Sequence, residues 1–358
     1  MNIYRCKPLV VGVLIIWATG LWAQSGNENI FIKTFKRTTE LQLSAINDGG
    51  DISVRGWEKD SIRVVVKTRL KSNSEEEQDM DWIKPSINQS KSQIVVNVEM
   101  EKPSQSFLSE WISKNIYDTN KSDVWIGYEI FMPKNMDLQI TSGFGKVVVE
   151  QWHGKLRIEQ EHGSLRIDGS INELSGALKF VKASLDQLNQ LDADLKQAEL
   201  KVQHVDIMSI RSTGGQLDIG SVDVLDMVSG RDDVLINHLG AASIDANFSH
   251  FDFQTVSGRQ DIKLLFGSLN IKGFKSTIPV MKIDQRSSDV SIYVGDKSFE
   301  FKAAIDGGVL RLPINTKVLS STNVDKSGKE KNIHALYGQG KTNIIQLYSK
   351  NGSVIFKH

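Results

Sequence analysis

Two pairs of aspartates have a spacing that suits acid–base chemistry. Asp192 and Asp194 alternate along one run, which would place both carboxylates on one face of a strand, and Asp232 and Asp233 are neighbours in a turn-like segment. Paired carboxylates can hydrolyse a glycosidic bond, so a polysaccharide lyase or hydrolase is one reading of these residues. Acids in turns are common, however, and the charges around these pairs are mixed in sign. We therefore predict no catalytic residues.

Histidines are the candidate metal ligands. No two of them have a ligand spacing such as His-Glu-x-x-His, and most fall in predicted turns, so we expect solvated or capping roles and no metal site. Calcium at the acidic turns stays open, although the Gly-Gly-x-Gly-x-Asp nonapeptide of calcium-binding coils is absent from the sequence. The histidines considered are His153, His162, His204, His238 and His250.

Gly338 to Thr342 has the letters of the end of a phosphate-binding loop. The first glycine of that pattern would fall at Ala335, and no strand, loop and helix surround the segment. We therefore expect no nucleotide and no other cofactor.

Aromatic side chains could stack on sugar rings, but most of the tryptophans precede the repeat described below. The simpler interpretation is that they pack an N-terminal module. Ser106 to Lys114 has helical spacing of apolar residues and would cover an open end of the fold or form a docking element. The tryptophans considered are Trp57, Trp82, Trp111, Trp125 and Trp152.

The composition argues against nucleic acid as a partner. Among 358 residues, 43 Lys and Arg balance 43 Asp and Glu, so no net charge attracts a polyanion.

The one cysteine, Cys6, precedes an apolar run, whereas a lipidated cysteine follows one. Residues 1–23 read as a signal peptide, with Arg5 and Lys7 before the apolar run and Ala23 at the cleavage point. An uncleaved membrane anchor is the alternative, but the run is short for a bilayer.

The centre of the chain is an internal repeat of short alternating strands. Leu138 and Ile140 are followed nine positions later by Val147 and Val149, and the same pairing recurs along the chain. Each run therefore has one apolar and one polar face. The second strands begin 15 to 21 residues apart, at Val147, Leu165, Leu185, Leu200, Leu217, Val234, Phe251, Leu269, Val290 and Val309.

Such a period predicts one coil per repeat. A single coil cannot bury its apolar side chains, whereas stacked coils pair in parallel ladders around one core. We predict an all-β, right-handed parallel β-solenoid, three-sided because many coils have a third apolar position, with an antiparallel sandwich as the alternative. Stacking would align the outward residues Arg166, Asp186, Lys201 and Asp218 into a ladder of alternating charge.

The ends of the chain differ from the repeat. We expect residues 24–134 to form an N-terminal β-rich capping module with a short helix opening at Ser74, and residues 135–312 to form the solenoid. Residues 313–358 are predicted to be a long loop over Val318 to Lys341 followed by a capping coil.

Three motifs resemble the bacterial putative-adhesin family of domains of unknown function, which is common in the Bacteroidota. They are Asn47 to Trp57, Tyr128 to Pro133, and the Ser-x-x-Gly-x-Val turns at Ser142 to Val147 and Ser349 to Val354. The resemblance covers most of the chain after residue 23. It implies a right-handed parallel β-solenoid and export, and it brings no catalytic residues.

The expected function is a noncatalytic, adhesin-like binding or scaffolding role in the bacterial envelope. The protein would be exported to the periplasm or the cell surface, without membrane insertion once the signal is cleaved. Its partner would be an envelope polymer or protein whose identity the sequence does not reveal, and the oligomeric state is equally open. The carbohydrate-active enzyme remains the alternative, and a structural envelope protein with no external ligand is a third.

Overall fold

The computed structural model describes residues 21–25, 28–38, 40–45, 50–70, 83–90, 92–100, 124–339 and 343–358. Within these ranges the fold is all β, with no helix, and therefore no helix that could cross a membrane. Several sequence predictions fall outside them: the helix at Ser74, the Ser106 to Lys114 segment, and Trp82 and Trp111. The predicted cleavage point after Ala23 lies inside the first strand, β1 (Leu21–Ser25).

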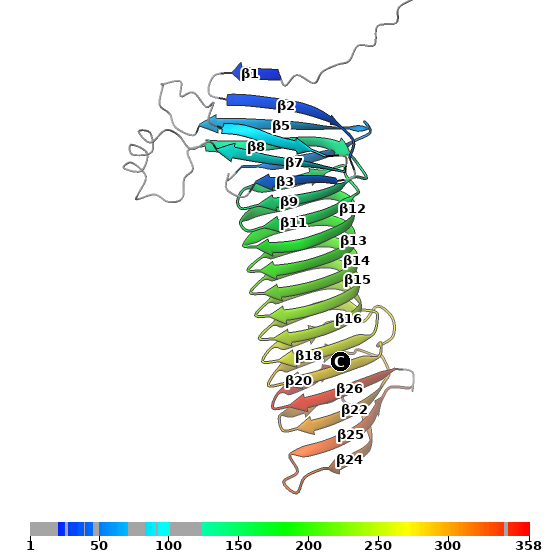
Figure 1. The fold of residues 1–358 in the computed structure, drawn as a ribbon. Helices are drawn as coiled ribbons and strands as arrows, with labels where there is room; N and C mark the ends of the chain where they lie inside the picture. The colour runs from blue at the N-terminus through cyan, green and yellow to red at the C-terminus, as the bar shows by residue number, and fades with distance from the viewer. Residues whose placement is uncertain are drawn as a thin grey trace, which may run out of the picture.

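The body of the molecule is a long column of stacked coils (Figure 1). Its strands are β9 (Asp137–Ser142), β10 (Lys146–Glu150), β11 (Lys155–Gln160), β12 (Gly163–Lys179), β13 (Val181–Lys196), β14 (Glu199–Thr213), β15 (Gln216–Gly230), β16 (Asp233–Asn247), β17 (His250–Val256), β18 (Gln260–Leu265), β19 (Ser268–Ile271), β20 (Met281–Arg286) and β21 (Asp289–Tyr293).

Neighbouring coils pair in parallel, which confirms the solenoid and excludes the antiparallel sandwich for this region. Leu200 is the register partner of Leu217, which pairs with Val234, which pairs with Phe251. The steps of 17 residues place an apolar side chain at the equivalent inward position of each of these coils. Leu165, Leu217 and Val234 are at most 3% exposed, so the alternation seen in the sequence does form one continuous core.

Two steps of the predicted register are wrong. Val290 pairs with Val354 rather than with Val309, which is 49% exposed. An earlier step is wrong by two residues. Leu165 pairs with Ala183 rather than with Leu185, and Ala183 pairs with Leu200. The small Ala183 still points inward at 4% exposure, and the corrected steps are 18 and 17 residues. The sequence pattern missed it because alanine is a weak apolar signal beside leucine.

The predicted charge ladder changes with that register. Ser184, and not Asp186, lies between Arg166 and Lys201. Lys201 does reach Asp218 on the next coil, at 3.7 Å, but Arg166 pairs instead with Glu150 on the preceding coil, at 3.2 Å. Alternating charges therefore connect neighbouring coils in pairs rather than along one unbroken ladder.

The solenoid begins earlier in the chain than residue 135. Strands β3 (Glu40–Ala45) and β4 (Ile52–Trp57) form a coil that stacks in parallel on β9 and β10. On this coil lie β7 (Gln93–Met100) and β8 (Val124–Pro133), each also parallel to its neighbour. The antiparallel strands β2 (Glu28–Lys36), β5 (Ser61–Leu70) and β6 (Ile83–Gln89) extend the sheet beyond them.

The C-terminal end corrects two predictions. Val318 to Lys341 is not simply a long loop, because β24 (Lys317–Asn323) and β25 (Glu330–Tyr337) form an antiparallel hairpin. The last strand pair, β26 (Ile344–Lys350) and β27 (Ser353–Lys357), is not the cap. It lies inside the stack, between β20 and β21 on one side and β22 (Phe299–Asp306) and β23 (Val309–Arg311) on the other.

The C-terminus therefore lies within the column, and the hairpin forms its end (Figure 1). β25 pairs antiparallel with β22, and β24 is exposed along its whole length. The antiparallel hairpin stops further parallel stacking, which a bare solenoid end would otherwise invite.

Candidate functional site

An open groove of about 760 Å³ crosses the outer surface of six strands, β13 to β17 and β19. Its floor is the backbone around the inward residues Ala183, Leu200, Leu217, Val234 and Phe251. Because alternate side chains of a strand point outward, the residues before and after each inward residue form two parallel walls. The groove therefore runs along the column axis, across the strands.

The walls of the groove are polar. The first row consists of Lys182, Glu199, Gln216, Asp233, His250 and Ser268. The second row consists of Ser184, Lys201, Asp218, Leu235, Asp252 and Asn270, the last five of which follow one another in register.

Four carboxylates and two lysines line the groove, and some of this charge is already paired. Lys182 lies 2.9 Å from Glu199, and Lys201 lies 3.7 Å from Asp218. The remaining groups are mostly hydroxyls and amides, which hydrogen-bond without regard to charge. Such a surface suits a neutral polymer and is unfavourable for a polyanion.

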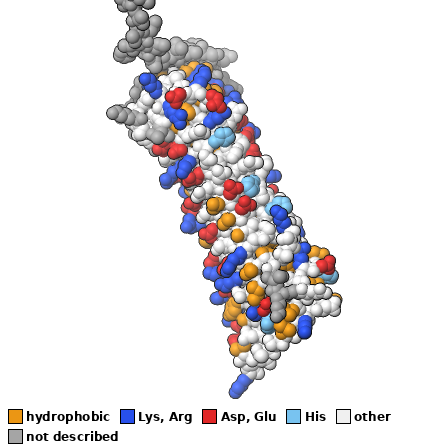
Figure 2. Space-filling view, turned by 90° about the vertical axis from the view of Figure 1, so that its right-hand side faces the viewer, with side chains coloured by type: hydrophobic (Ala, Val, Ile, Leu, Met, Phe, Trp, Pro, Cys, Tyr) orange, Lys and Arg blue, Asp and Glu red, His pale blue; other side chains and the backbone are white. Residues whose placement is uncertain are grey.

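Charges of both signs are also interspersed along the face shown in Figure 2, with no broad area of one sign. This distribution agrees with the balanced composition of the chain. It offers no extended cationic surface for nucleic acid on that face.

The aspartates considered for catalysis do not form one site. Asp232 is 1% exposed, and its carboxylate accepts hydrogen bonds from Ser212, Ser229 and the backbone N–H groups of Gly215 and Gly230, at 2.6 to 3.1 Å. It therefore fastens a corner and cannot reach a substrate. Asp233 lies in the groove, whereas Asp192 belongs to a different ladder, between Ser175 and Ser209.

Three of the histidines make contacts between neighbouring coils. His153 Nδ1 lies 2.6 Å from the carbonyl oxygen of Ser170, and His250 Nδ1 lies 2.8 Å from Ser268 Oγ. The His162 ring stacks between Phe144 and Phe180, at centroid distances of 4.9 and 5.1 Å. These contacts bind one coil to the next.

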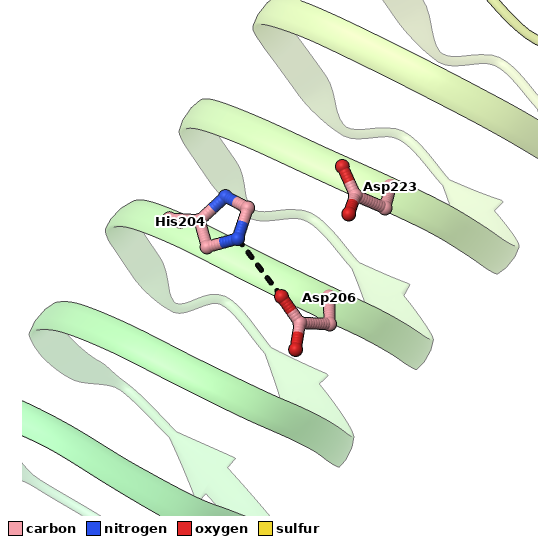
Figure 3. A group of neighbouring side chains, drawn as sticks. All are labelled: His204, Asp206 and Asp223. Atoms are coloured by element: carbon pink, nitrogen blue, oxygen red, sulfur yellow. Dashed lines mark hydrogen bonds and ion pairs between the residues drawn. The ribbon is translucent and has the colours of Figure 1, made fainter.

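His204 is different, because it lies beside two carboxylates. His204 and Asp206 come from β14 and Asp223 comes from β15, and their ligand atoms all lie within 4.8 Å of one another (Figure 3). His204 Nε2 is 2.9 Å from Asp206 Oδ1. The sequence carried a signal for this group that we did not use: Asp206 and Asp223 are 17 residues apart, which is one coil.

The described tryptophans pack as the simpler interpretation predicted. Trp152 is 1% exposed, and Trp57 lies against Phe131 with ring centroids 5.7 Å apart. The guanidinium of Arg69 lies 5.2 Å from the Trp125 ring centroid. All three belong to the N-terminal part of the column rather than to the groove.

Comparisons with known proteins find similarity among solved structures only. No protein-family model matches the chain, and no curated protein matches it. A putative cell adhesion protein from Clostridium sporogenes is 10% identical, with a TM-score of 0.21, over 92% of this chain and 99% of that one. A putative adhesin from Bacteroides fragilis is 13% identical, with a TM-score of 0.30, over 74% and 97%.

Both structures carry the names of putative adhesion proteins, the class that the sequence motifs resemble. At these identities and TM-scores, neither likeness carries an argument about the function of this chain.

Proposed function

We propose that this protein is a noncatalytic, adhesin-like solenoid of the bacterial envelope that binds an elongated, uncharged polysaccharide. The groove over β13 to β17 and β19 is the observation that carries this proposal. A polymer of repeating sugars requires a binding surface that is itself long and repetitive. Stacked coils supply one, because each coil presents outward, mostly polar side chains one strand spacing, about 4.8 Å, further along the axis.

The proposal includes details of the fold and the location. Each coil pairs with the next in three runs, for example at Leu200 with Leu217, at Val205 with Val222, and at Met208 with Leu225. These three runs support the three-sided form, and we propose that the coils wind right-handed, as parallel β crossovers do. The signal-like residues 1–23 support export to the periplasm or cell surface.

A noncatalytic role is favoured over a polysaccharide-active enzyme by the position of the acids. Asp232 is enclosed in its corner, and the Asp194 carboxylate lies 3.7 Å from Arg211. A glycosidase needs two carboxyl groups facing one bond, within about 5 to 10 Å of each other. Asp192 and Asp233 lie on separate ladders, so they do not supply such a pair.

The test is to obstruct the groove without touching the core. Ser184 is an exposed wall residue, and Ser184→Trp would place an indole across the path of a polymer. Ser243→Trp is the matched control, because Ser243 is also an exposed serine in a strand of the column and does not line the groove. Co-sedimentation with insoluble envelope polysaccharides would be measured for the wild type and both variants.

We expect the wild type and Ser243→Trp to co-sediment equally and Ser184→Trp to remain in solution. Equal binding by all three proteins, or release of soluble sugar from the polymer by the wild type, would contradict the proposal. Melting temperatures of both variants would be compared to confirm that each is folded.

A further inference from the structure

We propose that His204, Asp206 and Asp223 form a binding site for a divalent transition-metal ion, with Zn²⁺ as the representative. The three side chains project outward from adjacent coils (Figure 3). This site is separate from the groove proposed to bind polysaccharide, because none of the three residues lines it.

The stacking of the coils brings the ligands together. Val205 and Val222 are register partners and point into the core, at 0% and 1% exposure. The residues on either side of each valine therefore point outward. This places His204 and Asp206 side by side on β14 and sets Asp223 beside them on β15. No other group of three His, Cys, Asp or Glu among the described residues converges in this way.

The second ring nitrogen of His204 has the partner that a metal-binding histidine requires. Nδ1 lies 2.7 Å from Ser221 Oγ, and that hydroxyl donates its own proton to the carbonyl oxygen of Gln203 at 3.4 Å. When Oγ accepts from Nδ1–H, the lone pair of the neutral imidazole lies on Nε2 and is available to a metal ion. Metal-ligating histidines are generally oriented by such a hydrogen bond.

Nε2 lies 2.9 Å from a carboxylate oxygen of Asp206, so either a proton on Nε2 or a metal ion can lie between the two atoms. The separation is close to the edge of an octahedron with metal–ligand bonds of about 2.1 Å. A proton on Nε2 would serve His204 and Asp206 alone, whereas a metal ion also uses the third ligand, Asp223.

The donor set indicates which ion fits. One imidazole nitrogen and two carboxylate oxygens suit Zn²⁺ or Mn²⁺, while Ca²⁺ prefers six to eight oxygen ligands and does not favour imidazole. Side-chain exposures of 38% for His204 and 51% for Asp206 leave room for water to complete the coordination shell.

The experiment is calorimetric titration of the untagged full chain with ZnCl₂, and separately with CaCl₂. We expect one Zn²⁺ per chain in this site and no saturable heat from Ca²⁺. His204→Gln and Asp223→Asn should each weaken Zn²⁺ binding by about tenfold or more. The matched controls, His153→Gln and Asp226→Asn, change an outward histidine and an outward aspartate elsewhere on the column and should bind as the wild type does.

A second measurement keeps the test independent of the variants. Co²⁺ added to the wild type should give a d–d spectrum that differs from that of aqueous Co²⁺, and one equivalent of Zn²⁺ should restore the aqueous spectrum. The proposal is overturned if the wild type binds no Zn²⁺, if the control variants lose as much affinity as His204→Gln, or if Asp223→Asn binds unchanged. The last result would show that Asp223 is not a ligand of the ion.

Discussion

Ser229 Oγ donates a 2.6 Å hydrogen bond to Asp232 Oδ2 inside a corner of the solenoid where both residues are buried. Ser249 Oγ lies 2.9 Å from Ser229 Oγ and accepts a hydrogen bond from the backbone N–H of Asp232 at 3.1 Å. This network satisfies the buried polar groups of three successive coils at one corner.

Replacing Asp232 with alanine should destabilise the fold strongly. Four donors, two of them backbone N–H groups, would lose their acceptor without access to water, at a cost of about 3 kcal/mol or more. Asp233→Ala, at the exposed neighbouring position, should change stability by about 0.5 kcal/mol or less. Urea denaturation followed by circular dichroism measures both, and similar midpoints would contradict the assigned role of Asp232.

Substitutions at two glycines can distinguish the cost of backbone strain from the cost of a steric clash between coils. Gly163 and Gly169 have φ angles of +101° and +96°, which residues other than glycine rarely adopt. A Cβ on Gly163 would lie 2.0 Å from the carbonyl oxygen of Gly145 on the neighbouring coil, whereas a Cβ on Gly169 would meet nothing within 4 Å.

Gly169→Ala should therefore cost only the conformational strain, about 1 to 2 kcal/mol. Gly163→Ala should cost clearly more, because it also forces two coils apart. The free energies of unfolding of the two variants test this order. If Gly169→Ala proved the more damaging, the close approach of Gly145 and Gly163 would be incorrect.

The position of the last coil can be tested with a pair of leucines. Leu347 in β26 is 4% exposed, because coils cover it on both sides, whereas Leu319 in the terminal strand β24 is 45% exposed. Leu347→Asp should cost about 4 kcal/mol or more, since it buries a charge in the core. Leu319→Asp should have a small effect. Comparable losses would mean that β26 lies at the end of the stack, as the sequence suggested.

Acid should remove the contribution of one cross-coil ion pair. A hydrogen bond from Arg55, 2.8 Å away, lowers the pKa of Glu150 below its ordinary value of 4.5, and Arg166 lowers it further. Because the pKa is lower in the folded state, the stabilisation is full above the unfolded-state pKa and is lost as pH falls through the folded-state value.

Glu150→Gln should therefore reduce stability by about 0.5 to 1 kcal/mol at pH 7. The difference from the wild type should shrink below the ordinary pKa of 4.5 and vanish once Glu150 is protonated in the folded protein. Denaturation curves at several pH values measure this difference. A gap that stays constant down to the lowest pH would show that the carboxylate charge is not responsible.

The sequence alone determined the repeating architecture, because burial of one strand face on each coil requires a local alternation of apolar and polar residues. Alternation such as Leu138, Ile140, Val147 and Val149 predicts half-buried strands, and the near-constant interval predicts that they stack. The errors in that register arose at Ala183, where the inward residue is small, and at Val309, where β26 and β27 enter the stack ahead of β22 and β23. The family resemblance pointed to the same fold from different residues.

Only the tertiary structure decided which distant segments become neighbours. Arg55 meets Glu150 across 95 residues, and β26 enters the stack between coils that precede it in sequence. The buried setting of Asp232 and the convergence of His204, Asp206 and Asp223 also depend on which coil lies against which. Many strands of the chain are similar, and which two of them pair depends on the free energy of contacts between residues far apart in sequence. The residue pattern within one coil does not contain that information.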